Sequence, residues 1–230
     1  MDPGSYLAHL RRESGAFEAC LAGDLSAPVE HCGEWTLYDL ADHLGQGNMW
    51  AAMAVAEKHG DYEGPAAPPE RAALTRWFRD TCGVQLAALD TDPSVSAWTI
   101  APPPTAGFWQ RRRCLETLVH RWDAEHALGI PSSLDPELAA DGVAEVVGTI
   151  TPRQARLGRM AAPRHAIRLR ARDTGSSWTL GPGEPVATIG ATAANLLLLL
   201  WGRLPADDPA ITWEGDRRNG EPTLSGPLVP

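Results

Sequence analysis

Residues 116–123 read Glu-Thr-Leu-Val-His-Arg-Trp-Asp, and this spacing predicts a helix that carries a pair of metal ligands. Glu116 and His120 are four residues apart, so on a helix their side chains lie one above the other on the same face. A carboxylate and an imidazole in that register can bind one divalent ion. Because leucine, valine and tryptophan fill neighbouring positions, part of the same helix is expected to pack in a core.

A third candidate ligand, His43, lies far upstream in the stretch Asp39-Leu40-Ala41-Asp42-His43-Leu44-Gly45. Two helices that each carry ligands on one face suggest a bundle with a metal site between its helices. Two histidines and one glutamate match a catalytic zinc site, which keeps one coordination position open. On spacing alone, the alternative is that Glu116 and His120 form a solvated pair.

Asp123 follows His120 by three residues and is a candidate support for the imidazole. Its carboxylate could accept a hydrogen bond from the second ring nitrogen, as carboxylates behind metal-binding histidines do. The alternative is an ion pair between Asp123 and Arg121 or another arginine at the surface. The other histidines fit the site less well, and we expect them to be solvated or structural: His9, His31, His59, His126 and His165.

The composition is that of an ordinary soluble globular protein, with 43% hydrophobic and 21% charged residues among 230. A net charge of −9 disfavours nucleic acid as a partner, because phosphate binding needs a clustered cationic face. The one tight basic run, Arg111–Arg113, is either a local anion site or a solvated helix start. The sequence contains no Gly-rich phosphate loop, nucleophile elbow or nucleotide fingerprint.

The cysteines and the N-terminal sequence favour a cytoplasmic protein with no membrane partner. No two cysteines have C-x-x-C spacing, and no secretory signal precedes them, so we expect four packed free thiols. The apolar run at 196–201 is far too short to span a bilayer. We expect a monomer or a weak homodimer.

Hydrophobic periodicity predicts a helical bundle at 1–150 and a smaller α+β domain at 151–230. Thr36 and Asp39 have the form of a capping box, and Gly129 suits the end of the helix that contains Glu116. Helices are predicted at 5–23, 36–57, 70–90, 107–128, 135–147 and 192–201. Strands are predicted at 166–171, 177–180, 187–190 and 211–214. The long irregular stretch at 91–105 is a candidate functional loop.

Several blocks of the sequence resemble the mycothiol-dependent maleylpyruvate isomerase family, which belongs to the DinB-like metal-binding four-helix bundles. Cys32-Gly33-Glu34-Trp35-Thr36, followed by 39–44, resembles the family's "CPGWTVxDLVAHL" segment. Residues 108–125 and 134–143 resemble the next two blocks, and 173–179 and 196–205 resemble the small C-terminal domain. Gly33-Glu34 replaces the usual Pro-Gly before Trp35, and the 91–105 loop is Pro-rich and idiosyncratic.

The resemblance implies an α+β two-domain fold: a four-helix bundle, then a small α/β domain with a mixed sheet and a helix. It implies that His43, Glu116 and His120 bind a divalent metal, with Zn2+ the usual ion. It also implies that mycothiol, the small thiol of actinobacteria, is the thiol cofactor or cosubstrate. Arg203 matches an arginine of the family's C-terminal domain, and we expect it, with Arg111 and Arg112, to contact carboxylates of cofactor or substrate.

The function expected from these residues is activation of a thiol as its thiolate, for attack on an electrophilic small molecule. The outcome is either sulfur transfer or thiol-assisted cis–trans isomerisation, and Asp123 and Arg203 are the expected catalytic residues. Two alternatives stay open: a bundle that binds a metal or ligand without turnover, and a thiol-independent metal hydrolase. Many members of this family have no known substrate, so the resemblance does not name one.

Overall fold

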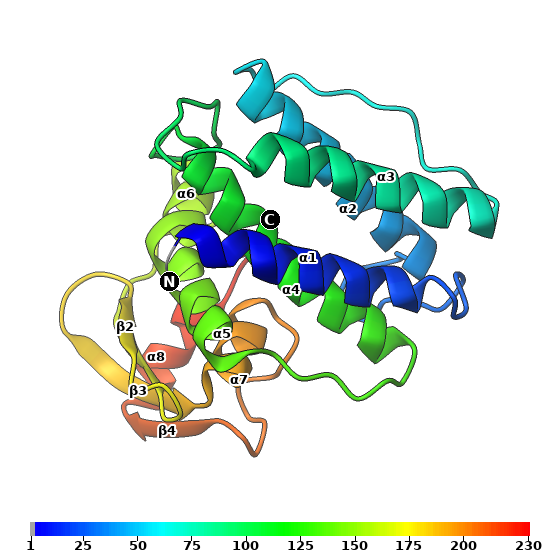
Figure 1. Cartoon of the computed structure of the whole chain (residues 1–230). Helices are drawn as coiled ribbons and strands as arrows, with labels where there is room; N and C mark the ends of the chain where they lie inside the picture. The colour runs from blue at the N-terminus through cyan, green and yellow to red at the C-terminus, as the bar shows by residue number, and fades with distance from the viewer. Residues whose placement is uncertain (1–2) are drawn as a thin grey trace. The chain divides into compact units, whose positions relative to one another are not determined.

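The structure is a computed structural model that describes residues 3–230, and it contains two compact units (Figure 1). The units are Met1–Ser133 and Leu134–Pro230. The division lies earlier in the chain than the boundary expected near residue 150. The reason is that α5 (Pro136–Glu145) packs against α7 (Ala193–Leu200) and therefore belongs to the second unit.

The first unit is built from four long helices. They are α1 (Pro3–Cys20), α2 (Leu37–Ala56), α3 (Arg71–Leu89) and α4 (Ala106–Ala127). Helix α1 packs along α4, and α2 packs along α3, while contacts of α2 with α4 and of α1 with α3 close the ring (Figure 1). The expected four-helix bundle is thereby confirmed, with α2 and α4 as neighbours that can share a site.

Local signals explain where the two site-bearing helices begin and end. The Thr36 side chain accepts a hydrogen bond from the Asp39 backbone N–H, and the Asp39 carboxylate accepts one from the Thr36 backbone N–H. This capping box starts α2, as the sequence predicted. Helix α4 ends before Gly129, which has a φ of +66°, a left-handed conformation that suits glycine.

The bundle interior is apolar, and it fixes the helices against one another. Phe17 of α1 and Phe78 of α3 lie with ring centroids 4.9 Å apart. Leu37, Leu40 and Leu44 of α2 are buried in the same core. Because these leucines occupy one face of α2, the neighbouring face that carries His43 is turned along the edge of the core.

The second unit combines short helices with a four-stranded sheet. Its strands are β1 (Ala166–Ala171), β2 (Ser177–Leu180), β3 (Pro185–Ala191) and β4 (Thr212–Gly215). Its further helical segments are a π-helical turn (Val146–Ile150), α6 (Thr151–Arg156), α8 (Arg217–Gly220) and a 3₁₀ turn (Glu221–Leu224). The sequence predicted the strands and α7 but neither the π-helical turn nor α6 and α8.

The sheet is mixed, with strand order β2-β1-β3-β4. Strand β1 pairs antiparallel with β2 and parallel with β3, and β4 pairs antiparallel with β3. In β1, Ile167 and Leu169 are buried while Arg168 and Arg170 are exposed, so one face meets the core. The parallel pair is joined through the β2 hairpin, and α7 then packs against β1 and β3. The predicted fold class is confirmed.

No helix within residues 3–230 is both long enough and apolar enough to cross a membrane. All four cysteines are free thiols: Cys20, Cys32, Cys82 and Cys114. Burial raises the pKa of Cys20 and of Cys82 to about 11. These two thiols therefore pack as small hydrophobic groups, as expected from the sequence.

Candidate metal centre

His43, Glu116 and His120 meet inside the first unit, and together they are called the inner triad below. One potential ligand atom from each residue lies within 4.8 Å of the other two. His43 comes from α2, whereas Glu116 and His120 come from successive turns of α4. The Nε2 atom of His43 is 3.3 Å from Oε1 of Glu116, and the two imidazole rings meet edge to face with centroids 5.2 Å apart.

Two buried arginines on α4 hold the second oxygen of Glu116. Arg113 donates a hydrogen bond from Nη1 to Oε2 at 2.6 Å, and Nη2 of Arg112 lies 3.5 Å from the same oxygen. Burial would raise the pKa of Glu116, but the charges of Arg112 and Arg113, with His43, outweigh it and hold that pKa well below its ordinary range. Glu116 is therefore a carboxylate at neutral pH, with Oε1 turned toward His43.

Asp123 supports His120 from behind. Its Oδ2 lies 2.9 Å from Nδ1 of His120, and both side chains are almost fully buried. This contact assigns the Nδ1 proton to the Asp123 side and leaves Nε2 as the ligating nitrogen. Burial lowers the pKa of His120 and outweighs the opposing effect of Asp123, so the imidazole is neutral at pH 7, the form that binds a metal.

A glycine on α2 makes room for this charge network. Arg113 also donates from Nη2 to the Oδ1 of Asn48 at 2.9 Å and to the carbonyl oxygen of Leu44. A Cβ atom on Gly47 would lie 2.6 Å from Nη1 of Arg113, so a side chain there would displace the guanidinium from its present position. The bare backbone at Gly47 therefore lets the buried guanidinium reach Glu116 from between the helices.

A cavity of about 360 Å³ opens beside His43 and Glu116. His43, Glu116 and Arg113 form one wall, and polar groups of Gln46 and Tyr62 line the rest with Trp50 and two glycines. This volume lies within the range of sites for small ligands, roughly 300–1,000 Å³. The cavity can therefore seat a small molecule beside His43 and Glu116.

The loop before α2 covers the other side of the triad. The Trp35 ring packs against the His43 ring with centroids 4.9 Å apart. The Cys32 thiol lies 3.8 Å from Oδ2 of Asp123, and Cys32, His120 and Asp123 form a further group of close potential ligands. The sequence assigned Cys32 to packing, since nothing in its spacing shows that the loop folds back onto α4.

Two family models match nearly the whole chain. The mycothiol maleylpyruvate isomerase N-terminal domain matches residues 7–125, and the C-terminal domain of the same family matches residues 137–222. The chain belongs to the mycothiol maleylpyruvate isomerase family. This confirms the family predicted from the sequence and, because the family is one of enzymes, the prediction of an enzyme.

Relatives of this isomerase family member occur in Mycobacterium tuberculosis strain H37Rv. The chain is 31% identical over 160 residues to the uncharacterized protein Rv0738, covering 66% of the chain and 81% of that protein. It is 25% identical over 234 residues to the uncharacterized protein Rv0036c, covering 88% of the chain and 86% of that protein. These relatives place similar sequences in an actinobacterium, as the mycothiol prediction expected.

Solved structures of mycothiol-dependent maleylpyruvate isomerase share the fold of this family member. A histidine-to-alanine mutant of that enzyme matches with a TM-score of 0.71 at 14% identity, and the enzyme itself matches with a TM-score of 0.69 at 15% identity. Each match covers 93% of both chains. At this identity the likeness shows the fold alone.

The remaining predicted site residues of this family member have different surroundings. Arg112 is 3% exposed and contacts Glu116, which favours support of the carboxylate over contact with a cofactor. Arg111 is half-buried on the same helix. Arg203 lies in the second unit, donates a hydrogen bond to the carbonyl oxygen of Trp201 at 2.7 Å and lies over the Trp201 ring. Contacts of Arg111 and Arg203 with a cofactor or substrate stay predictions.

Proposed function

We propose that this protein is a divalent-metal enzyme that uses mycothiol to act on an electrophilic small molecule. The observation that carries the proposal is the convergence of His43, Glu116 and His120, with a cavity beside His43 and Glu116. Membership in the mycothiol maleylpyruvate isomerase family supplies the thiol. The solved isomerase with the same fold acts on maleylpyruvate. For this chain we propose only the class of substrate, an electrophilic small molecule.

The inner triad fits a zinc ion by donor type and by spacing. Two ligands about 2.0–2.1 Å from one tetrahedral zinc ion lie roughly 3.3 Å apart. The measured separation of His43 Nε2 from Glu116 Oε1 is 3.3 Å. Since the remaining separations within the triad are at most 4.8 Å, small side-chain movements bring His120 into the same coordination sphere.

Each protein group at the site has a distinct task in the proposed enzyme. The inner triad would supply three ligands to a divalent ion. A bound divalent ion supplies the chemistry of the centre by favouring the thiolate form of a coordinating thiol. Asp123 orients His120, while Arg112 and Arg113 keep Glu116 ionised. Trp35 shields His43 on the side of the loop.

Two reactions share this arrangement, and we propose them as a pair. In one, the thiolate of mycothiol adds to an electrophilic carbon, the electrophile takes up the proton, and the new carbon–sulfur bond remains. In the other, the carbon–sulfur bond breaks again after rotation and leaves a cis–trans isomer. Carboxylates of cofactor or substrate would be bound by arginine, for which we propose Arg111 and Arg203. A thiol-independent hydrolase is less well supported, because Asp123, a candidate base, is already engaged with His120.

Metal analysis of the purified protein tests the site. The His43→Ala and His120→Ala variants are expected to lose one divalent ion per chain, because each removes a ligand of the inner triad. The matched control is His59→Ala, which removes an exposed histidine whose partner is Glu57. Full metal retention in both triad variants would overturn the assignment.

Titration of the cobalt-substituted protein with mycothiol tests the use of the thiol. A sulfur-to-cobalt charge-transfer band is expected on addition of mycothiol and not on addition of its S-methyl derivative. Absence of the band in a protein that does hold the metal would favour a bundle that binds metal or ligand without thiol chemistry.

A further inference from the structure

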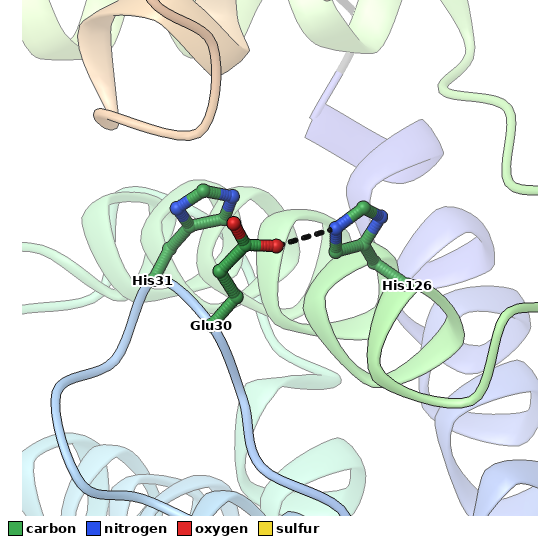
Figure 2. A group of neighbouring side chains, drawn as sticks. All are labelled: Glu30, His31 and His126. Atoms are coloured by element: carbon green, nitrogen blue, oxygen red, sulfur yellow. Dashed lines mark hydrogen bonds and ion pairs between the residues drawn. The ribbon is translucent and has the colours of Figure 1, made fainter.

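Glu30, His31 and His126 form a second cluster in the first unit, called the surface triad below (Figure 2). Glu30 and His31 belong to the loop before α2, and His126 lies in the last turn of α4. Figure 2 shows the Glu30 carboxylate between the two imidazole rings, and its Oε2 is 3.1 Å from Nε2 of His126. One potential ligand atom from each of the three residues lies within 4.8 Å of the others.

We propose that the surface triad is a second binding site for a divalent transition-metal ion, and that the ion joins the loop to the end of α4. Two imidazoles and one carboxylate are ligands that suit Zn2+, Cu2+ and Ni2+. The proposal goes beyond the thiol chemistry of the inner triad and does not depend on it, since the two triads share no residue.

Aromatic stacking holds the two imidazoles in place. The His126 ring stacks on the Trp122 ring with centroids 4.7 Å apart and an angle of 9° between the planes. The His31 ring lies nearly parallel to both, at 5.9 Å from His126 and 6.2 Å from Trp122. Because the rings are already ordered, ion binding costs less side-chain entropy than it would with free side chains.

The charges around the surface triad also favour a cation. Helix α4 ends at Ala127, and the last turn of a helix carries partial negative charge. The loop segment 30–35 also contains Glu34 and no lysine or arginine, whereas on α4 Glu125 is paired with Arg121 and Asp123 with His120. A dication at His126 therefore meets the carboxylate of Glu30 and the partial negative charge at the end of α4.

A simple exposed hydrogen bond is the alternative explanation for the Glu30–His126 contact, and the chain contains a matched example of one. Nε2 of His59 lies 3.0 Å from Oε2 of Glu57, in an exposed pair. No third ligand joins that pair among the described residues. The surface triad differs in its second imidazole, which is the feature that turns a pair into a metal site.

The ion would fix the loop that covers the inner triad. The same loop carries Cys32, whose thiol faces Asp123, and Trp35, whose ring packs on His43. An ion held by His31 and His126 joins this loop to α4 through coordination bonds. Occupancy of the surface triad is thereby expected to steady Trp35 over His43.

The test is the number of Zn2+ ions bound by the full chain, measured by equilibrium dialysis and metal analysis. A His43→Ala/His120→Ala double variant is expected to keep about one ion per chain, and adding His126→Ala is expected to remove it. Adding His59→Ala instead is the matched control and should leave the ion bound. The proposal would be overturned if the two triple variants, with His126→Ala and with His59→Ala, bound the same number of ions. Loss of all binding in the double variant would also overturn it.

Copper supplies a readout that does not rest on stoichiometry. Cu2+ bound to the double variant is expected to show paramagnetic-resonance couplings from two imidazole nitrogens, and His31→Ala should reduce them to one. Two nitrogens retained in His31→Ala would place the ion elsewhere. This test also separates the surface site from the proposed function. If the inner triad binds no metal, the wild-type protein is expected to bind one ion at the surface triad, and His126→Ala is expected to lose it. Circular dichroism confirms that each variant is folded.

Discussion

The inner triad and the surface triad have the same three side chains, two histidines and a glutamate, in two different surroundings. In the inner triad Glu116 is largely buried and Arg113 holds its second oxygen, whereas in the surface triad 68% of the Glu30 side chain is exposed. A carboxylate supports His120 from behind, whereas an indole supports His126. The contrast teaches that ligand identity alone does not define a metal centre. The groups behind the ligands differ, and we expect this difference to give the two triads different metal affinities.

Removal of the glutamate gives the largest expected difference between the two triads. Glu116→Ala takes away a metal ligand and leaves two buried guanidinium groups without their carboxylate, so a destabilisation of about 3–5 kcal/mol is expected. Glu30→Ala removes an exposed carboxylate and is expected to leave the melting temperature of metal-free protein unchanged. Thermal unfolding of the metal-free proteins measures both. Equal melting temperatures of the two variants would show that the arginines around Glu116 need no counter-charge.

The reactivity of the cysteines reports on the loop before α2, which carries residues next to both triads. Because burial raises the pKa of Cys20 and Cys82 from 9.0 to about 11, their thiolate fraction at pH 8 falls about a hundredfold, and alkylation slows at least as much. Cys32 is only half-buried and is expected to react first in native protein. Peptide mapping after a short exposure to iodoacetamide measures the order.

Zinc extends the same labelling experiment. If an ion on the surface triad fixes the loop, added Zn2+ slows alkylation of Cys32, and His126→Ala removes this protection. Protection that persists in His126→Ala but disappears in His120→Ala would point instead to direct binding by Cys32, His120 and Asp123. The rate of Cys32 alkylation therefore reports which cluster the ion occupies.

Loss of the carboxylate behind His120 should weaken one triad and spare the other. Asp123→Asn replaces the charged acceptor at Nδ1 of His120, and the metal affinity of the inner triad is expected to fall about 10–100-fold. Competition with a chromophoric chelator measures this affinity in a His126→Ala background, where only the inner triad can bind. An unchanged affinity would mean that packing alone orients His120.

The smallest expected effect is on the stability of helix α2, which follows the loop of the surface triad and carries His43 of the inner triad. Thr36→Ala removes the side-chain cap of α2 at the junction between the loop and the helix that carries His43, and a destabilisation of about 1 kcal/mol is expected. Thr36→Ser keeps the hydroxyl and is the control. Denaturant unfolding monitored by helical circular dichroism measures the change. A Thr36→Ala protein as stable as Thr36→Ser would show that Asp39 alone maintains the helix start.

Most of the fold, and the placing of Glu116 and His120 on one helix face, could be predicted because their signals are local, whereas the meeting of His43 with them was expected from a helical bundle and from the family resemblance. The Thr36–Asp39 capping box, Gly129 and the alternation at 166–171 each act through residues close in sequence. The spacing of Glu116 and His120 on one helix was enough to place two ligands on one face.

What sequence could not supply depends on long-range packing. His31 and His126 were expected to be solvated or structural, and the sequence did not show that the folded loop brings these distant positions together. A basic run does not show that Arg112 is buried against Glu116, and the expected contact of Arg112 with a cofactor or substrate stays a prediction. The π-helical turn at 146–150 also has no local signal that we recognise.

The absence of a side chain at Gly47 has a consequence for the order in which the protein folds. Helix α2 carries Gly45 and Gly47 on either side of Gln46, and each glycine lowers helix propensity by about 1 kcal/mol relative to alanine. The segment just after His43 is therefore a weak helix in isolation, and its shape comes from packing of Trp77 and Arg113 into the space the glycines leave. His43 is expected to reach its final position only after α3 and α4 have docked, so the ligands assemble late in folding.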